Sequence, residues 1–164
     1  GMMFGYATDA QVPKVRGVIL NSGVGRVAKD EKAIELVEKG LTLIAGQKAV
    51  RTKAKKSIAS FKTRQGMPIG VKVSLRGNRM YEFLDRLISV ALPRTRDFHG
   101  IPHNSVDQGG NLTLGVKEDI VFPETSHDKA GHIFGFEVTV VTDAKGKRKE
   151  AARMLELLGF PFAK

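Results

Sequence analysis

A glycine-rich run, GVGRVA at residues 23–28, has the spacing of a dinucleotide-binding turn, G-x-G-x-x-A. Backbone N–H groups of such a turn can hold a phosphate at the start of a helix. A dinucleotide-binding unit also needs a parallel apolar strand after that helix, but the residues after Gly46 are QKAVR, which is basic. Two other interpretations remain. Gly23 and Gly25 permit positive φ in a tight turn, or the same amides face an RNA phosphate.

The histidines and carboxylates form no catalytic or metal-binding pattern. His99 and His103 have H-x3-H spacing, but Pro102 opposes the helix that would align them. Glu118 and Asp119 are adjacent, so on a strand they would point to opposite faces. There is no Cys to supply a thiolate or a disulfide. We therefore expect a protein that is not an enzyme, with no cofactor, no metal and no small-molecule substrate. A nucleotide-dependent enzyme that uses the Gly23–Gly25 turn is the alternative.

The positive charge is concentrated in one part of the chain. The 164 residues carry a net charge of +10, and 41% of them are hydrophobic, enough for one compact domain over residues 1–164. Lys39 to Tyr81 contains no Asp or Glu but eleven of the 27 Lys and Arg residues. Such a block favours a polyanion as partner, nucleic acid first, although it could also be a solvated surface. No apolar stretch is long enough to span a membrane, and no signal peptide is visible.

Both strands and helices are predicted as the elements that position these residues. β-Branched residues predict a strand over Pro13–Leu20 that ends in a turn at Asn21-Ser22-Gly23, and helical spacing predicts a helix from Asp30 to Gly46. Val71, Val73 and Leu75 alternate with polar residues, as in a strand with one buried face. Its antiparallel partner lies within Ala49–Phe61, and the turn-rich tip Arg64–Gly70 joins the two strands.

The second half of the chain continues in the same way. We expect a helix over Asn78–Leu92 that ends at Pro93, strands over Asn111–Val116 and Ile133–Thr142, and a last helix over Lys147–Leu158. Without strict βαβ alternation, the fold class is α+β. It is a single antiparallel β-sheet with helices packed on one face and a projecting basic β-hairpin.

Long stretches of the chain closely resemble one protein family. These are VPKVRGVILNSGVG (residues 12–25), the central run from Ala45 to Leu87 that includes KTRQGMPIGVKVSLRGNRMYEF, ALPRTRDFHG (91–100), NLTLGVKEDIVFPE (111–124) and LLGFPF (157–162). The resemblance is to the bacterial-type ribosomal protein five family of the large subunit, and it spans nearly the whole chain. It implies a structural protein that binds 5S rRNA and anchors it in the central protuberance against the large-subunit rRNA. It also implies contacts with peptidyl-site tRNA and with neighbouring ribosomal proteins, on a ribosome in the cytoplasm or in an organelle.

The family's 5S-facing polar positions fall on Asn21, Gln47 and Ser74, where Ser74 replaces the usual Thr and keeps the hydroxyl. From its place before Gly23, Asn21 would also suit a turn cap. Phosphate contacts are expected from basic residues of the charged block: Lys48, Arg51, Lys53, Lys55, Lys56, Lys62 and Arg76. The resemblance assigns the tRNA contact to the loop residues Arg64, Gln65, Gly66, Met67 and Pro68.

Besides Ser74, the sequence departs from the family pattern at its start and before Asn111. Only about a dozen residues precede Pro13, so the family's N-terminal helix is expected to be absent or truncated. Gln108-Gly109-Gly110 stands where the family often has a basic residue between glycines. Either departure could change a contact with RNA or with a protein.

Overall fold

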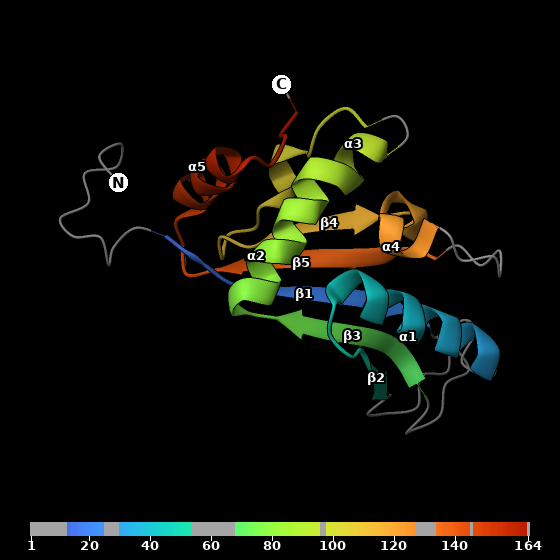
Figure 1. Ribbon diagram of the computed structural model, residues 1–164. Helices are drawn as coiled ribbons and strands as arrows, with labels where there is room; N and C mark the ends of the chain where they lie inside the picture. The colour runs from blue at the N-terminus through green and yellow to red at the C-terminus, as the bar shows by residue number, and fades with distance from the viewer. Residues whose placement is uncertain are drawn as a thin grey trace.

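The computed structural model describes residues 13–24, 30–53, 68–95, 98–126, 134–144 and 146–163, and strands from these ranges form one antiparallel sheet (Figure 1). Across the sheet the strands are β2 (Val50–Lys53), β3 (Pro68–Leu75), β1 (Val15–Gly23), β5 (Phe136–Thr142) and β4 (Leu112–Val116). Figure 1 shows α1 (Glu31–Ala45) and α2 (Gly77–Arg86) crossing one face of this sheet. The predicted α+β fold is confirmed.

The core lies between the sheet and these helices. β1, β3 and β5 place alternate side chains on the covered face, where Leu20, Val73 and Val138 are fully or almost fully buried. α1 contributes Ile34, Leu41 and other buried residues from one side of the helix. Within the described ranges, no helix combines the length and the apolar character of a membrane span.

The ends of α1 follow the sequence signals. The side chain of Asp30 accepts a hydrogen bond from the backbone N–H of Ala33 at 3.2 Å, as an N-cap does. Gly46 ends the helix with φ of 72°, and its N–H donates to the carbonyl oxygen of Thr42. The predicted boundaries of this helix are therefore confirmed.

The sequence predicted that the second helix ends at Leu92, directly before Pro93. The structure shows that the helical run continues beyond that point. α2 continues through a π-helical segment, η5 (Leu87–Ala91), into the short helix α3 (Leu92–Arg94). Pro93 follows directly after the hydrogen bond from the N–H of Leu92 to the carbonyl oxygen of Leu87, and it lies at the start of α3, which extends the helical run to Arg94. The last helix, α5 (Arg148–Leu158), ends at Gly159, which lies against Ile88 of this continuous segment.

Asn21, Ser22 and Gly23 do not form the predicted turn. They are the last residues of β1 and pair with Lys72, Val71 and Gly70 of β3. The interpretation of Asn21 as a turn cap is therefore wrong. Gly23 is also absent from the positive-φ glycines of the described residues, so it does not need that conformation. Pairing with β3 along all three residues, and with β5 at Asn21, overrides the local turn preference of these residue types.

The topology excludes the dinucleotide-binding alternative. The strand that follows α1 is β2, which pairs antiparallel with β3, and β1 pairs antiparallel with both of its neighbours. A dinucleotide-binding unit would need the strand after α1 to be the hydrogen-bonded parallel neighbour of β1, but here the antiparallel strand β3 lies between β1 and β2. The remainder of the glycine-rich run, residues 25–28, lies outside the described residues.

Asp143 fastens the start of β1 to the end of β5. Its Oδ1 accepts a hydrogen bond from the backbone N–H of Lys14 at 2.7 Å, and its Oδ2 accepts from Nε of Arg16 at 3.0 Å. Partial burial by itself would raise the pKa of Asp143. The Lys14 hydrogen bond and the Arg16 guanidinium outweigh that effect and lower the pKa below its ordinary value.

Because this pKa is lowered by folding, the ionised Asp143 stabilises the native state above the carboxyl's unfolded pKa of about 4. That stabilisation is lost as the pH falls through the lower, folded-state pKa. Asp143→Asn is therefore expected to lower the free energy of unfolding at pH 7, and the deficit relative to the native sequence should shrink towards pH 3. Urea unfolding at several pH values measures this difference. A deficit that is constant with pH would show that the charge is not involved.

Candidate nucleic-acid interface

The face of the sheet opposite α1 and α2 carries Asn21, which the structure places in β1. Cα pairing aligns one row across all five strands, in the order Val50, Lys72, Asn21, Glu137 and Gly115. Lys72 is half-buried and the other four residues are exposed. Asn21 therefore lies in the middle of an open face, with a cation on one side and a carboxylate on the other.

Glycines keep this open face flat around Asn21. A Cβ on Gly70 would lie 3.2 Å from Oδ1 of Asn21 and 2.8 Å from Oγ1 of Thr52, so any side chain there would crowd both groups. Gly23 and Gly115 have nothing within 4 Å of the space that a Cβ would occupy. A nucleic-acid backbone can approach such a surface closely, because no side chains project from these positions.

Ser74 lies on the same face as Asn21. It pairs with Ile19, two residues along β1 from Asn21, so the two are diagonal neighbours, about 7–8 Å apart in an antiparallel pair. Gln47, in the loop between α1 and β2, donates from Nε2 to the backbone carbonyl of Ser74 at 2.9 Å. The fold thus brings together the three polar residues singled out in the sequence.

Four of the predicted phosphate contacts lie in described parts of the chain, and they differ in environment. Lys48, Lys53 and Arg76 are exposed. The Cγ of Arg76 would lie 4.0 Å from a Cβ on Gly17, which places this side chain beside β1. The three form no ion pair with any described residue.

Arg51 faces the opposite side of the sheet from Lys72. Its guanidinium pairs with Glu31 at 2.6 Å and with Glu38 at 3.0 Å, both on α1. The hydrogen bonds to Glu31 and then Glu38 hold the pKa of Arg51 above its ordinary value. An RNA phosphate would have to compete with two carboxylates for this side chain. We therefore expect Arg51 to contribute less to phosphate binding than Lys48, Lys53 and Arg76.

The tip of the predicted basic hairpin lies largely outside the described residues. This applies to Lys55, Lys56, Lys62 and the loop residues Arg64, Gln65, Gly66 and Met67. Pro68 begins β3, and it pairs with Lys53 at the end of β2. The strands that lead into the tip are thus antiparallel neighbours, as the hairpin prediction requires.

Sequence reasoning did not include Glu137 in the interface. Its alternation with the buried residues Phe136 and Val138 predicts an outward side chain. The sequence holds no signal that β5 lies beside β1 and so brings Glu137 next to Asn21. Arg79 lies within the basic block from Lys39 to Tyr81, and no sequence signal indicates its contact with Gln47.

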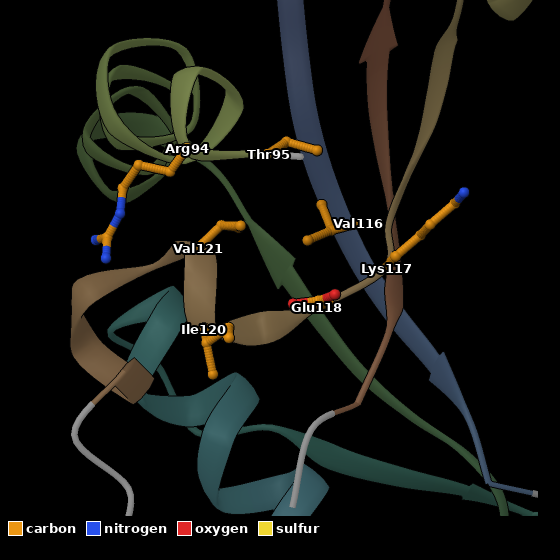
Figure 2. Close-up of a pocket in the computed structure, with 7 residues that line it drawn as sticks. All are labelled: Arg94, Thr95, Val116, Lys117, Glu118, Ile120 and Val121. Atoms are coloured by element: carbon orange, nitrogen blue, oxygen red, sulfur yellow. The ribbon is translucent and has the colours of Figure 1, made fainter. Parts of the chain in front are cut away.

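A small pocket at the end of β4 is not a candidate catalytic site. It has a volume of about 170 Å³ and is lined by Arg94, Thr95, Val116, Lys117, Glu118, Ile120 and Val121. In Figure 2, the side chains of Arg94 and Lys117 extend in opposite directions, and Glu118 is the single carboxylate. Asp119 is directed elsewhere, because its Oδ1 accepts from the backbone N–H of Phe134. Among the described residues no three His, Cys, Asp or Glu side chains form a group that could hold a metal ion.

The fold and the interface define a basic α+β protein with helices on one face of an antiparallel sheet and an open polar face on the other. One family model, "Ribosomal protein L5", matches residues 9–64, and a second model, for the C-terminus of the same ribosomal protein family, matches residues 68–162. The chain belongs to the ribosomal protein L5 family. It is a ribosomal protein of the large subunit and not an enzyme, as the sequence predicted.

Curated relatives are similar over nearly the full chain. Three are named "Large ribosomal subunit protein uL5", and each aligns over 161 residues, which are 98% of this chain and 89% of the relative. The protein of Thermoanaerobacter sp. (strain X514) is 56% identical, that of Caldanaerobacter subterraneus subsp. tengcongensis 53%, and that of Alkaliphilus metalliredigens 48%. The predicted location in the ribosome follows from this membership.

Proposed function

We propose that this ribosomal protein binds 5S rRNA with the open face of its sheet and anchors it in the central protuberance against the large-subunit rRNA. Asn21, Gln47 and Ser74 discriminate 5S rRNA from other RNA, while Lys48, Lys53 and Arg76 hold phosphates. The loop from Arg64 to Pro68 contacts peptidyl-site tRNA, and neighbouring ribosomal proteins complete the contacts of the chain.

The observation that carries this proposal is the clustering of three polar side chains, two on the open face and Gln47 beside it. Asn21 and Ser74 lie on adjacent strands, and Gln47 is hydrogen-bonded to the backbone of Ser74. Amide and hydroxyl groups can distinguish bases and ribose, which phosphate-binding cations cannot do. The exposed cations around the cluster provide affinity that does not depend on sequence.

A competition titration tests the proposal. The purified protein is titrated with 5S rRNA and with an unrelated RNA of the same length at two salt concentrations. Tight, salt-sensitive binding with a clear preference for 5S rRNA is expected. Equal, weak binding to both RNAs would reduce the interface to a generic basic surface and would contradict the proposal.

Asn21→Ala is expected to reduce the preference for 5S rRNA about threefold to tenfold, the effect of losing one hydrogen bond to RNA. The ratio of the two dissociation constants measures this. Asn104→Ala is the matched control, because Asn104 is an exposed asparagine outside the sheet, in the segment between α3 and β4. We expect the control to keep the native ratio. If Asn21→Ala weakens binding of both RNAs equally, Asn21 supports the fold and does not read the RNA.

A further inference from the structure

The side-chain amide of Gln47 is held at both ends. Nε2 donates to the backbone carbonyl of Ser74 at 2.9 Å, and Oε1 accepts from Nη1 of Arg79 at 3.2 Å. The three residues come from different elements: the loop after α1, strand β3 and the first turn of α2. One amide therefore connects three parts of the fold beside the open face.

The chemistry of the two partners allows only one orientation of this amide. A backbone carbonyl can only accept a hydrogen bond, so it requires the NH₂ group of Gln47. A guanidinium can only donate, so it requires the carbonyl oxygen of Gln47. A flipped amide would place donor against donor and acceptor against acceptor. In the observed orientation one N–H and one lone pair of Gln47 remain for a ligand, in a fixed order.

We propose that Arg79 is a positioning residue that gives the protein its selectivity for 5S rRNA by fixing the orientation of Gln47. This inference rests on the proposed function, in which Gln47 contacts the RNA. Arg79 is exposed and has no ion pair among the described residues, so no carboxylate of that part of the chain holds its guanidinium beside Gln47. Without Arg79, Oε1 loses its partner and the amide keeps only the bond to Ser74.

A double-mutant cycle separates this role from the positive charge of Arg79. Binding of 5S rRNA and of an unrelated RNA of the same length is measured for the native protein, Arg79→Ala, Gln47→Ala and the double variant. Arg79→Ala is expected to lower the 5S preference about threefold to tenfold in the native background. In the Gln47→Ala background the same change is expected to lower the preference no further.

Arg76→Ala is the matched control for the loss of charge, because Arg76 is an exposed arginine three residues away with no bond to Gln47. It should weaken binding of both RNAs equally and leave their ratio unchanged. Equal reductions of the 5S preference by Arg79→Ala in both backgrounds would overturn the inference. So would a native ratio in Arg79→Ala, provided that the native protein prefers 5S rRNA. If the native protein shows no preference, the proposed function itself fails.

A second measurement needs no RNA. In ¹⁵N NMR spectra of the free protein, the side-chain NH₂ of Gln47 is expected to be ordered, and Arg79→Ala should make it mobile while the melting temperature stays close to the native value. An NH₂ group that is equally ordered in the variant would show that Ser74 alone positions Gln47, which would overturn the role of Arg79.

Discussion

Replacing Lys53, Lys55 and Lys56 together with alanine is expected to weaken RNA binding by more than tenfold at moderate salt. Each phosphate contact releases condensed counterions, so the slope of log affinity against log salt should fall by up to about three units. Of the three lysines, the structure describes Lys53, which is exposed at the end of β2. Titrations of 5S rRNA at four or more salt concentrations measure the slope.

The control for this variant removes the same charge from another part of the surface. Lys117, Lys147 and Lys149 are exposed lysines of the C-terminal half, outside the block from Lys39 to Tyr81. Alanine at these three positions also lowers the net charge from +10 to +7, but the salt slope is expected to stay close to the native one. Equal flattening by both triple variants would mean that overall charge, rather than the basic hairpin, binds the RNA.

The largest effect on stability is expected from Gly110→Ala. Gly110 has φ of +84°, and a Cβ there would lie 2.5 Å from the carbonyl oxygen of Ala144. Its own carbonyl accepts a hydrogen bond from Oγ1 of Thr142 at 2.6 Å, so the backbone cannot move away without breaking that bond. Strain and overlap together should lower the free energy of unfolding by about 3 kcal/mol. The melting temperature should fall by roughly 6–12 °C.

Gly146→Ala separates the cost of backbone strain from the cost of atomic overlap. Gly146 has φ of +70° but nothing within 4 Å of the position of a Cβ. It should lose about 1 kcal/mol, the cost of the left-handed conformation alone. Thermal unfolding of both variants by circular dichroism gives the comparison. Equal losses would show that the loop at Gly110 relaxes around the new methyl group.

The parts of the fold that the sequence predicted well are those whose signals are local. Asp30 and Gly46 mark the ends of α1 because an N-cap side chain and a positive φ are needed at those points, whatever the rest of the chain does. The alternation from Val71 to Leu75 likewise follows from one buried face, and β3 has that pattern.

The failures occurred where distant segments decide the local structure. Asn21, Ser22 and Gly23 are common in turns, but β3 pairs with β1 along all three residues, β5 also pairs with Asn21, and the strand is extended. Pro93 marked a helix end, but the π-helical segment before it places the proline in the first turn of α3.

In the candidate site, too, local patterns could be predicted from the sequence and long-range contacts could not. The resemblance to the family supplied Asn21, Gln47 and Ser74, and the charge pattern supplied the lysines. Neither could supply the hydrogen bond from Arg79 to Gln47, which joins residues 32 positions apart. The ion pairs of Arg51 with Glu31 and Glu38 could not be predicted either, because they depend on α1 crossing the covered face of the sheet within reach of β2.

The central position of β1 bears on how the protein is made. Its two neighbours are β3, which ends at Leu75, and β5, which begins only at Phe136, so β1 receives one partner more than 110 residues after its own start. Asn21, Gln47 and Ser74 all precede that point. These three residues of the proposed RNA-binding site therefore leave the translating ribosome before the strand that completes the sheet, and pairing over such a separation is intrinsically slow. During that interval the new chain exposes one edge of β1, and binding of RNA to the flanking residues would stabilise the unfinished sheet.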